Sequence, residues 1–314
     1  MAKTDNLSDF LTDVANSIRT KTGTTEQINA QDFSDKILSI QSESTLKKLL
    51  DTTKSADYLF SNYSGTFASV ENVIQPSDTE NVTSMRYTFS NCRELQHIPQ
   101  LNTSNVTDMT GMFKGFTSLH FTPSLDTSKV TSMREMFSGC TQLGIGAGSG
   151  GIPLFDTSNV TDMESMFEHC SSLWTNDVPQ FDTSKVTNMY NMFKNCTGLE
   201  SIPQFDTSNV TLMAGMFEGC TGLTTVPALN ADKVTNMMSM FEGCTNLKSI
   251  LMTNIGTDLT IAYSTKFERE DLLVILNNLK TVTSTKVLTM GATNLAKLTE
   301  EDKAIATNKG WTLA

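Results

Sequence analysis

The stretch Asp156-Thr-Ser-Asn-Val-Thr-Asp-Met-Glu-Ser-Met-Phe-Glu-His-Cys170 decides the fold, because close variants of it recur along the chain. Its phenylalanine recurs at intervals of 24, 24, 30, 26, 24 and 24 residues. The seven copies are Phe89, Phe113, Phe137, Phe167, Phe193, Phe217 and Phe241. A fixed period of this length is typical of a solenoid, in which each repeat forms one coil and stacks on the next. The sequence therefore predicts an elongated α/β solenoid.

Apolar residues inside one repeat indicate a short helix. Val160, Met163, Met166, Phe167 and Cys170 are spaced by 3, 3, 1 and 3 residues, which places them on one face of a helix. Thirteen of the 17 methionines occupy the two methionine positions of this pattern. We expect these methionines and the recurring phenylalanines to form the core.

The second half of each repeat predicts a very short parallel strand. The stretch Leu199–Phe205 reads as extended, and proline removes one ladder donor, so the strand has to be short. Six prolines hold the same place in successive repeats: Pro99, Pro123, Pro153, Pro179, Pro203 and Pro227.

Composition excludes several classes of protein. The net charge is −11, which disfavours nucleic acid as a partner because binding to phosphates needs clustered Lys and Arg. No apolar stretch is long enough to insert in a membrane. The first residues lack the apolar segment of a secretory signal.

The chain offers no catalytic set, no cofactor motif and no metal site. The six cysteines occupy one repeat position and form no Cys-x-x-Cys pair, so buried free thiols are expected; they are Cys92, Cys140, Cys170, Cys196, Cys220 and Cys244. A column of carboxylates caps turns or, alternatively, binds calcium between coils. Its members are Asp78, Asp126, Asp156, Asp182 and Asp206.

The unit Asp-Thr-Ser-Asn-Val-Thr-x-Met-x-x-Met-Phe-x-x-Cys-x-x-Leu resembles the BspA-like leucine-rich repeat family of bacterial and mobile-element surface proteins. The resemblance covers residues 78–250, which we expect to form seven coils. It implies a leucine-rich-repeat solenoid used for adhesion or protein binding, without catalytic residues. The protein is therefore not expected to be an enzyme.

Residues 1–44 lie outside the repeat and predict a helical anchoring module. Its apolar anchoring positions are Leu7, Phe10, Leu11, Val14, Ile18, Phe33 and Ile37. The stretches Ala15–Gly23 and Ile28–Phe33 resemble a short N-terminal module of phage structural proteins. A plain cap on the solenoid is the alternative.

Two further segments close the stack. Residues 45–77 resemble a degenerate capping coil, and residues 251–314 predict a C-terminal cap. In the cap we expect a helix at 267–279, a strand at 286–290, a helix at 298–308 with Thr299 as its N-cap, and a last strand at 311–313.

Strand-side positions vary from repeat to repeat while core positions stay constant, which predicts a binding strip. Its residues are His97, Gln100, Trp174, Gln180, Glu200 and Gln204. The function predicted is that of a phage virion protein, tail-associated and receptor-binding or fibre-forming. A capsid decoration or head fibre and a bacterial surface adhesin are the alternatives. The expected partners are other virion proteins at the N-terminal module and a host cell-surface protein or glycan, with several copies of the chain assembled together.

Overall fold

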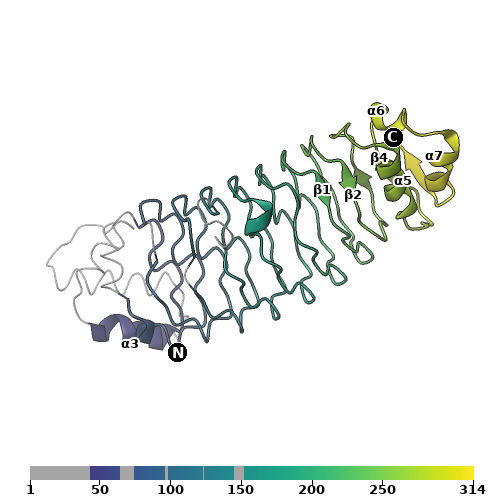
Figure 1. Cartoon of the computed structure of the whole chain (residues 1–314). Helices are drawn as coiled ribbons and strands as arrows, with labels where there is room; N and C mark the ends of the chain where they lie inside the picture. Colours follow the sequence, from purple (N-terminus) through teal and green to yellow (C-terminus); the bar gives the residue numbers. More distant parts are fainter. Residues whose placement is uncertain (1–42, 64–73, 96–97, 123, 145–151) are drawn as a thin grey trace, which may run out of the picture.

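The computed structural model describes residues 43–63, 74–95, 98–122, 124–144 and 152–314. It is an elongated stack of coils that ends in a small α/β cap at the C-terminus (Figure 1). Parallel bridges join the same position of each coil to the next, through Ser55, Ser84, Asp108, Ser132, Asp162, Asn188, Leu212 and Asn236. None of the helices in these ranges combines the length and the apolar character that a membrane crossing needs.

One side of each coil, which we call the turn wall, runs from residue 211 to residue 220 and through the equivalent residues of the other coils. Its backbone N–H groups alternate between two kinds of acceptor. Gly215 donates to the carbonyl of Met238 in the next coil at 2.9 Å, whereas Glu218 donates back to the carbonyl of Gly215 at 3.0 Å. The turn wall is therefore a run of tight turns tied to its neighbours by a continuous ladder.

The helix predicted for Val160–Cys170 is wrong, because the turn wall contains turns instead. Two positions in each turn wall have positive φ, which a right-handed helix excludes. The second of these positions is occupied in successive coils by Asn62, Asn91, Gly115, Gly139, His169, Asn195, Gly219 and Gly243. The apolar spacing imitated a helix because turns that repeat every three to four residues also send one set of side chains inward.

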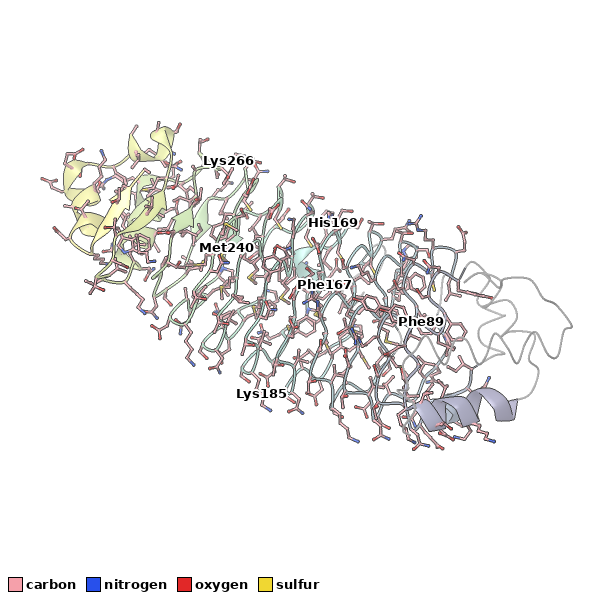
Figure 2. All side chains as sticks on the ribbon, turned by 180° about the vertical axis from the view of Figure 1, so that it is seen from behind. Phe89, Phe167, His169, Lys185, Met240 and Lys266 are labelled. Carbon is pink, nitrogen blue, oxygen red and sulfur yellow. The ribbon has the colours of Figure 1, made fainter. Side chains whose placement is uncertain are left out.

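The predicted core is confirmed. The recurring phenylalanines stack face to face along the whole array, and the 30-residue spacing between Phe137 and Phe167 leaves their ring centroids only 5.7 Å apart. All thirteen methionines of the repeat are buried beside them. Figure 2 shows Phe89, Phe167 and Met240 along the middle of the stack, with His169 at one edge and Lys185 at the other.

The opposite side of each coil, which we call the return wall, runs from residue 223 to residue 230 and through the equivalent residues. It packs on the turn wall across the core, as in the stacked rings of Phe193 and Phe205, whose centroids are 6.4 Å apart. Within the described ranges, the predicted short strands appear only as β1 (Thr225–Val226) and β2 (Ser249–Ile250), which pair in parallel. The main coil-to-coil ladder thus lies on the wall where a helix was expected.

The six cysteines are free and buried, as predicted. Each sulfhydryl donates to the carbonyl of a phenylalanine in the preceding coil, for example Cys170 Sγ to Phe137 O at 3.1 Å. Burial raises the pKa of Cys92 and of Cys244 to about 12. The thiols therefore stay neutral and serve as core residues.

The N-terminal end of the described chain begins with α3 (Glu43–Thr53), a helix in the segment expected to be only a degenerate coil. The short helix η1 (Pro76–Asp78) follows. Between them, Phe60 stacks on Phe89 at 5.3 Å, which continues the phenylalanine column. Of the anchoring module predicted at 1–44, residues 1–42, with all seven anchoring residues, lie outside the described residues.

The C-terminal cap contains the predicted elements. They are α5 (Arg269–Asn277), β4 (Lys286–Thr289), α7 (Glu300–Thr307) and β5 (Trp311–Leu313). Thr299 caps α7 as predicted, accepting the N–H of Asp302 at 3.2 Å. Two elements that were not predicted, β3 (Leu259–Thr260) and α6 (Ala292–Leu295), complete it. The three strands form a parallel sheet in the order β3-β4-β5.

Candidate binding surface

The residues of the predicted binding strip lie on or beside the return wall. Gln100, Trp174 and Glu200 are exposed there. His97 lies outside the described residues. The strip is therefore available to a partner over several coils.

Trp174 is held in place by a short helix, η2 (Thr175–Asp177). The Asp177 carboxylate accepts the backbone N–H of Trp174 at 3.0 Å, and the Thr175 hydroxyl accepts the backbone N–H of Ser201 in the next coil at 2.9 Å. Trp174 is 62% exposed on this hydrogen-bonded backbone. An exposed tryptophan is a typical anchor for binding.

Two of the predicted residues, Gln180 and Gln204, join adjacent coils. Each side-chain amide donates to a backbone carbonyl of the following coil, Gln180 to Gln204 and Gln204 to Ala228. An open groove of about 440 Å³ lies beside them and is lined also by Asp182 and Asp206. These glutamines therefore stabilise the return wall as well as forming part of its surface.

Sequence reasoning missed two exposed apolar residues on the same side. Leu154 takes the place that glutamine holds in three other coils, and its side chain is 72% exposed. Phe121 is exposed one coil earlier. The signal was present in the sequence. Leu154 directly follows Pro153 and Phe121 lies two residues before Pro123, and polar residues are usual at both positions in the other repeats.

The carboxylate column caps turns, as predicted, in four of its five members. In Asp156 one carboxylate oxygen accepts both the backbone N–H of Ser158 at 3.0 Å and its hydroxyl at 2.6 Å. These bonds, the hydroxyl first, hold the pKa of Asp156 below its ordinary value. Asp126, Asp182 and Asp206 make the same turn with the serine two residues on.

Asp78, the fifth member, behaves differently. Its carboxylate accepts the backbone N–H of Gln75 at 2.8 Å within the first turn of η1. Across the described ranges, no three His, Cys, Asp or Glu side chains gather closely enough to hold a metal ion.

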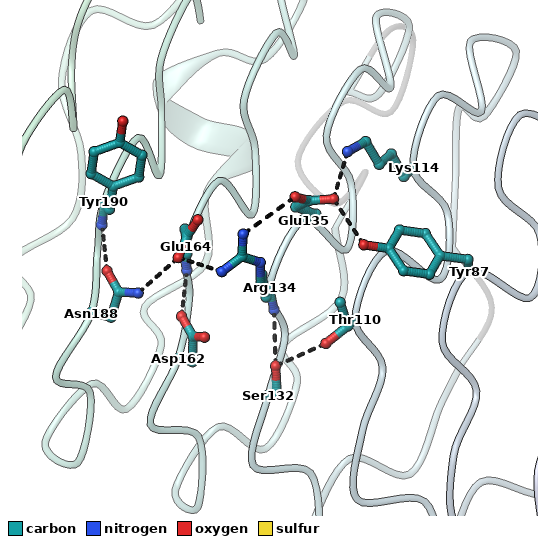
Figure 3. Close-up of polar contacts among 10 residues, drawn as sticks. All are labelled: Tyr87, Thr110, Lys114, Ser132, Arg134, Glu135, Asp162, Glu164, Asn188 and Tyr190. Carbon is teal, nitrogen blue, oxygen red and sulfur yellow. Dashed lines mark hydrogen bonds and ion pairs between the residues drawn. The ribbon is translucent and has the colours of Figure 1, made fainter. Parts of the chain in front are cut away.

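The turn wall carries a chain of polar contacts that crosses several coils (Figure 3). The Glu135 carboxylate binds Lys114 Nζ at 2.5 Å and accepts the hydroxyl of Tyr87, two coils away, at 3.2 Å. Arg134 Nη1 contacts the carboxylate of Glu164 at 2.6 Å. The outward side chains of these coils therefore contact one another.

Stacked coils with two walls around one apolar column define the protein as a repeat protein. The model of one family matches residues 54–149 and 143–254, which include every coil of the stack. The chain belongs to this family, described as "Mycoplasma protein of unknown function, DUF285".

The comparison with solved structures found a leucine-rich repeat protein from Bacteroides ovatus ATCC 8483. The two chains share 17% sequence identity, the match covers 78% of this chain and 80% of that one, and the TM-score is 0.32. No curated protein matches the chain.

Proposed function

We propose that the protein is an adhesin-like binding protein of the leucine-rich-repeat type, and that its return wall contacts the partner. One observation carries this proposal. Phe121, Leu154 and Trp174, three large apolar residues on successive coils, are exposed on one side of a regular scaffold. Burying such side chains against a partner stabilises a complex, since each contributes about 1.5–3 kcal/mol of transfer free energy.

The partner class is a host cell-surface protein or glycan. Tryptophan is enriched among the residues that dominate binding energy, and Gln180 on the same coil and Glu200 on the next supply polar groups near it. A single return wall offers few such anchors, so strong attachment requires several copies of the chain acting together. The proposal therefore includes a homo-oligomer.

The setting we propose is a phage virion, where the protein acts as a tail-associated receptor-binding or fibre protein. The support is the sequence of residues 1–44, whose resemblance to a phage module makes other virion proteins its partners. A capsid decoration or head fibre has the same architecture. The bacterial surface adhesin is the second candidate, and the match to a family described from Mycoplasma favours it.

Cell binding by purified protein tests the adhesive role. A fluorescent wild-type protein is compared, by flow cytometry on candidate host cells, with the double variant Leu154→Ser/Trp174→Ser. Both substitutions remove exposed apolar groups, so the melting temperature should stay the same while cell binding falls by at least about tenfold. The matched control is Tyr263→Ser/Val274→Ser, which removes two exposed apolar residues from the C-terminal cap and should bind cells like the wild type. Equal binding by the return-wall variant and the wild type would refute the proposal.

Immunogold electron microscopy tests the setting. An antibody against the C-terminal cap should label virion tails if the protein is a fibre, capsids if it is a decoration, and cell envelopes if it is a bacterial adhesin. Gold particles confined to the cell interior would contradict all three placements.

A further inference from the structure

The turn wall of the last repeats carries a patch of apolar residues that are not buried in the core. Tyr190, Leu212 and Met238 are exposed, and Met238 is 71% exposed. They lie on three adjacent coils, since Asn188 bridges to Leu212 and Gly215 N–H donates to the Met238 carbonyl. We call Tyr190, Leu212, Ala214 and Met238 the turn-wall patch.

The turn-wall patch has a small residue at its centre. Ala214 occupies the coil between Tyr190 and Met238 and holds the same repeat position as both. It is only 2% exposed, whereas its two larger neighbours stand well clear of the wall. Ala214 is therefore covered, and a partner would meet the Tyr190 ring and the Met238 thioether.

Earlier coils have polar residues at the same position. Arg134 and Glu164 occupy it two and one coils before Tyr190, and the two form an ion pair at 2.6 Å. Those side chains satisfy one another on the surface (Figure 3). The Tyr190 side chain and the Met238 thioether have no comparable partner among the described residues, so their apolar surface is free for another molecule.

The backbone that joins the coils of the patch to one another is already hydrogen-bonded. Asn191 N–H donates to the Ala214 carbonyl at 3.0 Å, and Gly215 N–H donates to the Met238 carbonyl at 2.9 Å. An incoming strand cannot enter between these coils through main-chain hydrogen bonds. The coil of Met238 is the last of the ladder, and among the described residues the N–H groups of Ser239 and Gly243 donate to no further coil. Between the coils, recognition has to come from side chains of the partner.

Charges around the patch are acidic. Glu164, Glu218 and Asp162 border it, and Glu242 is exposed on the coil of Met238. Two of these carboxylates are already paired, Glu218 with Lys194 at 2.9 Å and Glu164 with Arg134 at 2.6 Å. Within the described part of the chain, Glu242 and Asp162 have no basic partner.

We infer that the turn-wall patch binds a polypeptide segment in which apolar side chains are flanked by lysine or arginine. The apolar residues would cover Tyr190, Leu212 and Met238, while the cations would meet the carboxylates at the rim and the face of the Tyr190 ring. A second copy of this chain fits poorly, because it would bring the same acidic rim against this one. The site is distinct from the return wall and remains available when that wall is occupied.

A yeast-displayed library of random peptides tests the inference. The library is selected on wild-type protein and counter-selected on the double variant Tyr190→Ser/Met238→Ser. The enriched peptides should combine apolar residues with lysine or arginine. A synthetic peptide of the consensus sequence should bind the double variant at least about tenfold more weakly than the wild type. Glu242→Gln should weaken binding less, and this loss should disappear at high salt.

The control is the return-wall variant Leu154→Ser/Trp174→Ser, which should bind the peptide like the wild type even where it has lost cell binding. The melting temperatures of all variants should agree, since only exposed groups change. No enrichment beyond the counter-selected pool would overturn the inference, as would enrichment of acidic peptides. A dimer in sedimentation velocity that Met238→Ser dissolves, or glycan-array binding that Met238→Ser removes, would assign the patch to another partner.

Discussion

The two walls of the stack differ in what holds them together. On the turn wall, alternate N–H groups donate to the next coil, as Gly215 does to Met238, and among the described residues the pattern repeats in each coil until the ladder ends at the coil of Met238. On the return wall, backbone pairing within the described residues is confined to the last coils. There β1 pairs with β2, Thr224 N–H donates to the Glu200 carbonyl at 2.9 Å, and Thr253 N–H donates to the Leu229 carbonyl at 2.9 Å. Side chains such as Gln180 and Gln204 link other coils. The backbone hydrogen bonding of the turn wall is uniform, whereas the links between coils on the return wall differ from coil to coil.

This difference explains where variation is tolerated. An insertion on the return side has little ladder to break, which is why the longer spacing before Phe167 leaves the phenylalanine column intact. The turn wall tolerates changes only in its outward side chains, such as Tyr190 and Met238. Each wall therefore offers a surface for binding, but the backbone path differs between coils only on the return wall.

Removing a ring from the column should have the largest effect, because the column supports both walls. Phe167 stacks on Phe193 at 5.6 Å within the column and on Phe181 of the return wall at 6.3 Å. Phe167→Ala should lower the free energy of unfolding by about 3–5 kcal/mol, through lost burial and the cavity left behind. Urea denaturation measures it.

The control for this substitution is Glu242→Ala, an exposed change on the turn wall, which should cost less than about 0.5 kcal/mol. Similar losses in the two variants would mean that the column does not hold the walls together.

The next effect concerns glycines of the turn wall. Gly219 and Gly243 have φ values of +72° and +75°, so alanine is strained by a similar amount at both, about 1–2 kcal/mol. At Gly219 a Cβ atom would also lie 2.0 Å from Asn195 Oδ1, whereas at Gly243 its nearest neighbour is 3.4 Å away. The Asn195 amide would have to turn away, so Gly219→Ala should destabilise the protein by about 0.5–1.5 kcal/mol more than Gly243→Ala. Parallel urea titrations compare them.

A double-mutant cycle isolates the collision. Asn195→Gly removes the amide and keeps a residue that tolerates positive φ, so it should rescue most of the extra cost of Gly219→Ala. If the double variant is no more stable than Gly219→Ala alone, the difference between the two glycines has another origin.

The sequence predicted the core better than it predicted the backbone. Burial follows from which residues are apolar, so Met163, Met166 and Phe167 could be assigned to the interior without knowing the local conformation. The choice between helix and turns depends on φ, and the available signal was the recurring Gly or Asn before the cysteine position. His169 holds that place in the quoted repeat, which hid the pattern there.

The candidate surfaces were predictable only in part. Trp174 was found because an aromatic residue stands out among polar ones. Leu154 and Met238 were not, because an exposed apolar residue cannot be told from a buried one until the facing direction of its position is known. The cap elements 267–279 and 298–308 were predicted well, since their helix periodicity and the Thr299 cap are local signals.

A smaller effect is expected at the corner between the walls, where a threonine hydroxyl usually bonds the next coil. Thr157 Oγ1 donates to the Asp182 carbonyl at 2.9 Å, whereas the equivalent Thr127 Oγ1 has no partner in the described residues. Thr157→Val should cost about 1–2 kcal/mol, because it also leaves a carbonyl unpaired. Thr127→Val should change stability by less than about 0.5 kcal/mol. Thermal unfolding of both variants provides the comparison, and equal losses would contradict the bonding pattern.

The smallest effect distinguishes two carboxylates of the same corner. The pKa of Asp156 is lowered chiefly by the hydroxyl of Ser158, whereas the pKa of Asp206 is lowered chiefly by the backbone N–H of Ser208. A carboxylate with a depressed pKa stabilises the fold at neutral pH, and this contribution is lost as the pH falls through its folded-state pKa, below 3.8. Ser158→Ala should therefore raise the pKa of Asp156 more than Ser208→Ala raises that of Asp206, and acid unfolding should begin at a higher pH. NMR titration of the carboxyl carbons measures both values. Alanine removes the serine hydroxyl but keeps the backbone N–H. Equal pKa shifts in the two variants would therefore contradict the assignment of different main hydrogen-bond donors to Asp156 and Asp206.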